Sequence, residues 1–216
     1  MELEENDGSN VIEDRRQQWP VQSREVLAEG RVMTFVEDVI DTPSGETMVR
    51  QFTTHPGAVA IVAWDEERDE IAVLRQYRHP VGMELVEIPA GLLDVPGEPW
   101  HEAAARELVE EAQLQAARWD VLIDIVTTPG GCQESLRVFL ARELSPAARP
   151  KGFVLEGEEL EMSVGRAPRA ELVDAAFAGR CQSPTLVAGI LALETARLSG
   201  RIDALRDVDA PWAIRE

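Results

Sequence analysis

Residues 91–114 read GLLDVPGEPWHEAAARELVEEAQL. The part Trp100–Gln113 reads as a helix, and Pro99 suits its first turn. Residues four apart share a helix face, so Glu107 and Glu111 point the same way. Hard divalent cations such as magnesium bind carboxylate oxygens, but most glutamate-rich helices present a solvated face. The spacing alone favours a solvated surface and leaves a cation site open.

The order of residues in this stretch resembles the Nudix box. That box runs glycine, five residues, glutamate, seven residues and then Arg-Glu-apolar-any-Glu-Glu-any-Gly-apolar. The matching positions are Gly91, Glu98, Arg106, Glu107, Leu108, Glu110, Glu111 and Leu114. A match with charged anchors over the whole stretch argues against a chance acidic helix.

Two positions depart from the box. Six residues, not five, separate Gly91 from Glu98, and Gln113 stands where the family has glycine. Glycine suits the left-handed conformation at a helix end, so the glutamine is expected to end the helix with a different loop, at a cost of about 1 kcal/mol. Neither change removes a carboxylate, so we expect altered loop geometry and unaltered chemistry.

The residues on either side of the box are similar to the ADP-ribose pyrophosphatase branch of the Nudix hydrolases. The supporting runs are Arg75-Gln76-Tyr77-Arg78 and Glu87-Ile88-Pro89-Ala90-Gly91 upstream, and Thr128-Pro129-Gly130 with Glu134-Ser135 downstream. The resemblance covers roughly residues 24–198. It implies hydrolysis of the diphosphate linkage of ADP-ribose to AMP and ribose 5-phosphate, with Mg²⁺ or Mn²⁺ as the cofactor.

The same resemblance implies roles for individual residues. The implied metal ligands are Ala90, through its carbonyl, with Glu107, Glu110 and Glu111; the implied catalytic residues are Arg106, Glu110 and Glu134; the implied substrate contacts are Arg75, Arg78 and Glu87. Glu134 would be the general base and Arg106 would orient the glutamates through ion pairs. Without the resemblance, arginines near a strand end and a glutamate in a loop are most often ordinary surface charges.

Composition limits the possible functions. The chain has 216 residues, 44% of them hydrophobic, and can bury the core of one compact domain. Its net charge of −19 argues against binding nucleic acid or anionic membranes and supports a small-molecule substrate, which the resemblance implies to be a nucleoside diphosphate. No apolar run approaches the roughly 20 residues that cross a bilayer. The acidic start, MELEENDGSN, is unlike a secretory signal, and Cys132 and Cys181 lack metal-ligand spacing. We therefore expect free thiols and a cytoplasmic protein.

The predicted fold is α/β (α+β): a mixed β-sheet sandwiched between α-helices, with an N-terminal antiparallel β subdomain. The predicted parts are a mobile acidic tail at 1–20, the β subdomain at 21–55, the hydrolase domain at 56–198 and a C-terminal tail at 199–216 that either packs or frays. Predicted strands are 25–28, 32–40, 48–53, 58–64, 71–76, 84–88, 121–126 and 136–144; predicted helices are 100–113, 169–178 and 184–198. In the ADP-ribose branch the N-terminal strands commonly form a dimer, so a homodimer is expected.

Other functions remain open at this stage. The box fixes diphosphate chemistry, but substrate specificity depends on loops, so a nucleotide sugar such as GDP-mannose or an oxidised nucleotide is an alternative substrate. A non-catalytic ADP-ribose-binding module is a second alternative, although such a module would be expected to lose the metal-binding glutamates. A purely structural acidic helix would not account for Glu87, Gly91 and Glu134 together.

Overall fold

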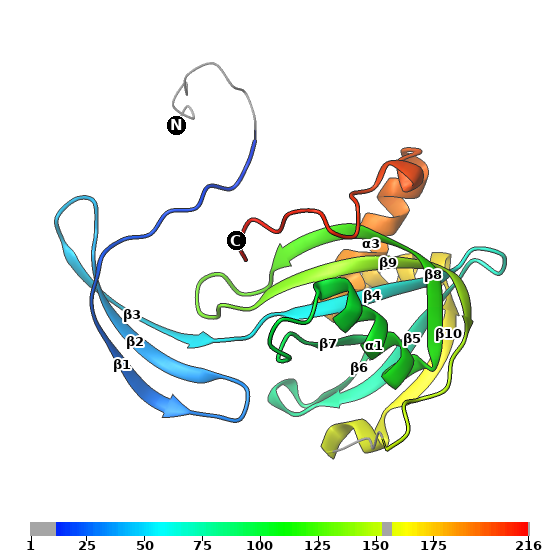
Figure 1. Ribbon diagram of the computed structural model, residues 1–216, viewed down its shortest axis with the longest axis horizontal. Coiled ribbons are helices and arrows are strands. Elements are labelled where there is room, and N and C mark those ends of the chain that lie inside the picture. Colours follow the sequence, from blue (N-terminus) through cyan, green and yellow to red (C-terminus); the bar gives the residue numbers. More distant parts are fainter. Residues whose placement is uncertain (1–11, 153–156, 216) are drawn as a thin grey trace.

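The computed structural model describes residues 12–152 and 157–215. Figure 1 shows a small antiparallel sheet that projects to one side of a larger body, and the body is a mixed sheet with helices on it. The predicted fold class is therefore confirmed. Residues 12–20 are exposed and have no regular secondary structure, and the rest of the predicted tail, 1–11, lies outside the described residues.

The projecting sheet has three strands in the order β1-β2-β3. They are β1 (Val21–Glu29), β2 (Thr34–Asp41) and β3 (Thr47–Thr54), and each lies where the sequence predicted a strand. All nine residues of β1 are exposed, whereas Val36 and Asp38 of β2 are buried. The small sheet thus has too little apolar contact of its own to be a second core.

The larger sheet has seven strands, with the hydrogen-bonded order β10-β5-β4-β9-β8, while β6 pairs with β5 and β7 with β4. Its strands are β4 (Ala58–Asp65), β5 (Glu70–Arg78), β6 (Met83–Glu87), β7 (Ala90–Leu92), β8 (Leu114–Val126), β9 (Ser135–Pro146) and β10 (Ser163–Pro168). The pair β4–β9 is parallel, which makes the sheet mixed. The sequence analysis missed β7 and β10 and predicted only the second half of β8.

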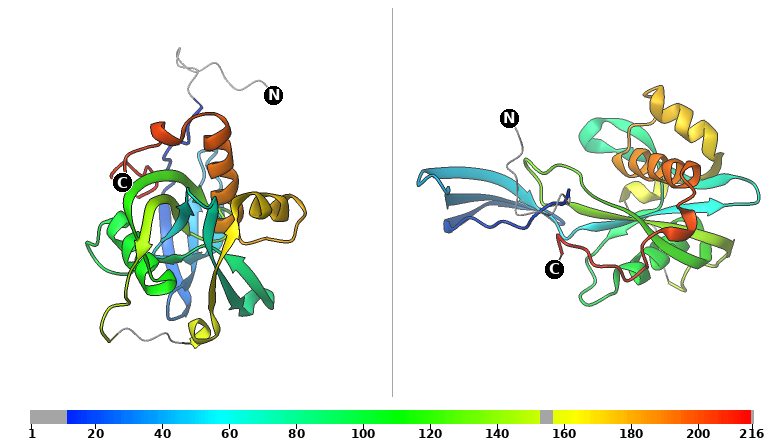
Figure 2. Two further views of the ribbon diagram at one scale, coloured as in Figure 1. Left: turned by 90° about the vertical axis from the view of Figure 1, so that its right-hand side faces the viewer. Right: turned by 90° about the horizontal axis from the view of Figure 1, so that it is seen from above.

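The central strand β4 is buried on both faces, as its nearly continuous apolar sequence indicates. Val59, Ile61 and Ala63 pack on the side of α1 (Trp100–Ala112), whereas Ala60 and Val62 pack on the side of the two later helices. Those helices are α2 (Arg169–Phe177) and α3 (Pro184–Leu198). The right-hand view of Figure 2 shows helices on both faces of the sheet, as predicted. Within the described ranges, no helix is long and apolar enough to span a bilayer.

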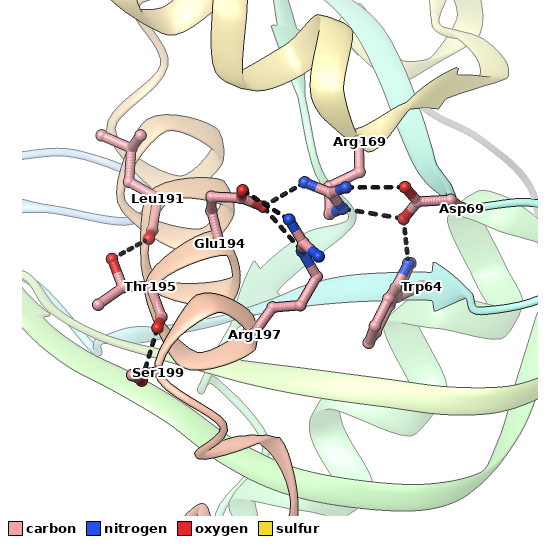
Figure 3. A network of polar contacts seen from close by, with 8 residues as sticks. All are labelled: Trp64, Asp69, Arg169, Leu191, Glu194, Thr195, Arg197 and Ser199. Carbon is pink, nitrogen blue, oxygen red and sulfur yellow. Dashed lines mark hydrogen bonds and ion pairs between the residues drawn. The ribbon is translucent and has the colours of Figure 1, made fainter.

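A polar network holds α2 and α3 to the edge of the hairpin β4–β5 (Figure 3). Arg169 is 7% exposed and forms two 2.8 Å hydrogen bonds with the carboxylate of Asp69. Its third nitrogen contacts Glu194 of α3, which also binds Arg197 at 2.9 Å. Hydrogen bonding to Arg169 lowers the pKa of Asp69 below its usual range. Because the network joins both helices to the sheet, it fixes the layer opposite α1.

The C-terminal segment packs against the body through the buried Arg137 of β9. The Arg137 guanidinium lies 4.9 Å from the ring centres of both Trp100 and Trp212 and forms an ion pair with Asp124 at 2.7 Å. It also donates to the carbonyl of Ala210 at 2.7 Å. The segment that was predicted either to pack or to fray is therefore packed, and Trp212 is 2% exposed.

Helix α1 ends differently from the sequence expectation. Gln113 itself adopts the left-handed conformation, with φ 54° and ψ 38°, and its N–H bonds back to the helix. The glutamine therefore forms the helix end that a glycine would form, and the expected alternative loop is wrong. The chain then enters β8 at Leu114 directly.

Candidate active site

Arg106 gathers three carboxylates of the box. It donates two 3.0 Å hydrogen bonds to Glu98 and contacts Glu107 at 2.6 Å and Glu110 at 3.2 Å. The hydrogen bonds to Glu98 raise the pKa of the Arg106 guanidinium above its usual value. Glu102, one turn before Arg106, is exposed and is not among its ion-pair partners in the described structure. The arrangement has the form expected of an arginine that orients glutamates.

Glu107 and Glu111 face β7, the strand that carries the glycine of the box. The Glu107 carboxyl lies directly over Gly91, because a Cβ built on that glycine would be 2.0 Å from Glu107 Cδ. Glu111 is 8% exposed and accepts a 2.9 Å hydrogen bond from the N–H of Ala90. The shared helix face that the spacing predicted therefore lies against the backbone of residues 90–91.

Gly91 is required because its missing side chain is the space that Glu107 occupies. We expect Gly91→Ala to displace the Glu107 carboxylate and to lower metal-dependent turnover by at least about a hundredfold. Gly165→Ala is the matched control, since Gly165 also lies in a strand and a Cβ there meets nothing within 4 Å. The measurement is the hydrolysis rate at saturating metal. Equal rates for the two variants would contradict this role of Gly91.

The chemistry of the donor set fits a hard divalent cation. The box offers carboxylate and backbone oxygens, which Mg²⁺ and Mn²⁺ prefer over softer ligands. Because Gly91 has no side chain, the Glu107 carboxylate has room beside the strand. Among the described residues, however, no group of three or more His, Cys, Asp or Glu side chains is arranged to hold a metal. Arg106 forms ion pairs with Glu98, Glu107 and Glu110 and so offsets part of their negative charge.

A cleft of about 920 Å³ lies beside β7, whose last residue, Leu92, lines it. It is lined by Arg31, Val32, Thr54, His55, Pro56, Gln76, Arg78, Leu92, Leu93, Asp94 and Gly157. One of the three implied substrate residues lines it: Arg78, which forms hydrogen bonds of 3.1 and 2.5 Å with the second, the buried Glu87. Arginines beside apolar side chains suit a ligand that has both a diphosphate and a base.

The structure separates Arg75 from these residues. Side chains alternate along β5, so Gln76 and Arg78 face the cleft while Arg75 faces the other side of the sheet. There it lines a second cavity of about 580 Å³ together with Val73 and Leu172, and lies 3.9 Å from Glu84. Arg75 and Arg78 are close in the sequence, but they line two different cavities.

Glu134 lies in the loop between β8 and β9, and the loop is fixed to the end of β3. Thr53 donates its N–H to Gly131 at 3.0 Å and accepts the N–H of Gln133 at 2.9 Å. The hydroxyl of Thr127 donates to one oxygen of Glu134, and His55 Nε2 lies 3.7 Å from the other. The sequence analysis missed His55, whose one visible signal is its place between the N-terminal strands and the buried strand β4.

Comparisons with known proteins show the family of the chain. The family model described as NUDIX domain matches residues 54–177. The chain is 40% identical over 193 residues to an ADP-ribose pyrophosphatase of Mycobacterium tuberculosis (strain ATCC 25618 / H37Rv), covering 89% of this chain and 90% of the relative. It is 37% identical over 129 residues to a methanol dehydrogenase activator of Bacillus methanolicus, covering 60% and 69%.

A solved structure shares the fold. A crystal structure of an ADP compounds hydrolase superposes with a TM-score of 0.70 at 24% identity and covers 88% of this chain and 100% of its own. At that identity the likeness concerns the fold alone. The match of the family model and the extent of the mycobacterial similarity together show that this chain belongs to the NUDIX family.

Proposed function

We propose that the protein hydrolyses the diphosphate linkage of ADP-ribose and releases AMP and ribose 5-phosphate. The observation that carries the proposal is the complete set of box carboxylates, two of which lie on the backbone of β7 beside an open cleft. The extent of the similarity to the mycobacterial ADP-ribose pyrophosphatase supports this choice of substrate.

Hydrolases of this family generally depend on a divalent metal ion. The proposed ligands here are Glu107, Glu110 and Glu111 with the carbonyl of Ala90, and the proposed ion is Mg²⁺ or Mn²⁺. When bound, such an ion neutralises diphosphate oxygens and lowers the pKa of a coordinated water. The protein supplies the ligands at fixed places, because Arg106 holds Glu107 and Glu110 while β7 holds Glu111.

Glu134 is the proposed general base. The water oxygen forms a bond to one phosphorus, Glu134 takes up a proton from that water, and the bridging P–O bond breaks. Arg78 is proposed to contact the substrate from the cleft wall, and Glu87, which fixes the Arg78 guanidinium, is proposed to bind the adenine or ribose side. A planar guanidinium held in this way suits bidentate binding of phosphate.

A panel of substrates tests the proposal. The purified protein is incubated with Mg²⁺ or Mn²⁺ and with ADP-ribose, GDP-mannose, an oxidised nucleoside triphosphate and related diphosphates, and the products are separated by chromatography. We expect AMP and ribose 5-phosphate from ADP-ribose at the highest kcat/KM. A clear preference for another compound would replace ADP-ribose as the substrate, and no turnover of any compound would contradict an enzymatic function.

We also propose that two copies pair through the N-terminal sheet. Large apolar side chains are exposed on β1, β2 and β3, among them Val26, Phe35 and Val49, and the sheet projects from the body (Figure 1). A second copy would cover them. Light scattering at micromolar concentration should then report a dimer.

The two free cysteines are as predicted, and they support the proposal of a reducing, cytoplasmic setting.

A further inference from the structure

The geometry points to His55 as a positioning residue that fixes the carboxylate of Glu134 for catalysis. This inference rests on the proposed function, because it assigns His55 a part in the step for which Glu134 is the proposed base. His55 comes from the turn between β3 and β4, far in sequence from the loop between β8 and β9 that carries Glu134. The fold brings the two side chains to 3.7 Å.

The Glu134 carboxylate lies between two donors. Thr127 donates its hydroxyl to Oε2, and His55 Nε2 faces Oε1. The separation from His55 exceeds a hydrogen bond but lies within the range of electrostatic attraction, and catalytic contacts often shorten when substrate binds. One oxygen of the carboxylate accepts a hydrogen bond from Thr127 and the other is attracted to His55, so the two contacts together limit its rotation.

The hydrogen bonds of His55 determine which ring nitrogen carries the proton. Nδ1 accepts a 3.0 Å hydrogen bond from the N–H of Gly57, so Nδ1 is unprotonated and Nε2 carries the hydrogen that faces Glu134. Burial lowers the pKa of His55, which Glu134 opposes and Arg215 reinforces. The ring is therefore a neutral donor at neutral pH, and its side chain is 8% exposed.

The backbone around His55 is fixed from both sides. Two residues earlier, Thr53 pairs with Gly131 and Gln133 of the Glu134 loop. One residue later, the carbonyl of Pro56 accepts a hydrogen bond from Arg215, whose guanidinium also lies over Gly57. His55 also lines the cleft in which the substrate is proposed to bind. His55 is thus held in place by its surroundings, and we infer that it positions the loop that carries Glu134.

Two substitutions separate the positioning role from a local structural one. In His55→Asn the side-chain oxygen can still accept the Gly57 N–H, as asparagine does in turns, but the side chain is too short to reach Glu134. In His55→Gln the amide nitrogen can take the place of Nε2 and donate to Glu134. His101→Gln is the matched control, because His101 contacts the exposed Asp209 outside the cleft.

We expect His55→Asn to lower kcat by about tenfold to a hundredfold with little change in KM, because the contact with His55 acts on the proposed base and not on substrate binding. His55→Gln should recover most of that loss. In a Glu134→Gln background the same His55→Asn change should cost less than about threefold, because residues that act as a unit are not additive. An equal loss in both backgrounds, or no loss in His55→Asn alone, would overturn the inference.

Hydrogen exchange provides a readout that does not need activity. His55→Asn should speed exchange of the hydrogen-bonded amides of residues 131–133, whereas His55→Gln should leave it close to that of the unmodified protein. Unchanged exchange in His55→Asn would also count against the inference. If the unmodified protein does not hydrolyse ADP-ribose, the proposed function fails while the exchange result still decides the role of His55. If it does, and the two-background test shows additivity, only the present inference fails.

Discussion

Replacing Glu107 or Glu111 by glutamine should abolish most of the Mg²⁺-dependent hydrolysis of ADP-ribose. Glutamine has nearly the same shape, and at position 111 its oxygen can still accept the N–H of Ala90, so the fold should persist. The loss of one anionic ligand removes several kcal/mol of charge stabilisation, which corresponds to a fall in kcat/KM of about a thousandfold or more. Steady-state kinetics over a range of Mg²⁺ concentrations is the measurement.

Glu102→Gln is the matched control for these two variants. Glu102 lies on the same helix and carries the same charge, but it is exposed and takes no part in the ion pairs of Arg106. Its kcat/KM should stay within about twofold of the unmodified value, as for most surface substitutions. If Glu107→Gln and Glu111→Gln both kept full activity, the proposed metal ligands would be wrong.

Replacing Glu134 by glutamine should leave substrate binding intact and reduce turnover by a factor of about 10² to 10⁴, the usual range for the loss of a general base. The amide keeps an oxygen that can accept from Thr127, so the loop should stay in place. Binding of a non-hydrolysable methylene analogue, measured by calorimetry, should be unchanged. Glu171→Gln, on the first turn of α2 and exposed, should not affect either quantity. A fall in turnover of tenfold or less would remove Glu134 from this role.

The sequence was sufficient where one pattern determined both local structure and chemistry. The alternation of apolar residues gave the strands of the projecting sheet, and the glutamate spacing gave α1 and the face with Glu107 and Glu111. The sequence patterns did not predict two short strands, β7 and β10. β7 has three residues and β10, SVGRAP, includes a glycine and a proline, so neither shows a strand pattern; both exist because the sheet offers them a hydrogen-bonding edge.

Contacts between distant segments could not be predicted in the same way. Arg75 and Arg78 are three residues apart, and only the observed strand shows that they face opposite sides. Arg137 reads as an ordinary polar residue within an apolar strand, yet it is 0% exposed and fixes the C-terminal segment through Trp212 and the carbonyl of Ala210. His55 acquires its partner only when the loop before β9 folds onto β3.

The central claim is that the carboxylates of α1 hold divalent cations beside β7 and so permit attack on a diphosphate. A crystal structure with Mn²⁺ and a methylene analogue of ADP-ribose tests it most directly, because anomalous scattering locates manganese independently of the protein model. The account predicts anomalous peaks at bonding distance from Glu107 and Glu111, with the analogue's phosphates on the same ions. Peaks absent from that place in crystals that contain the analogue, or carboxylates turned toward bulk water, would contradict it.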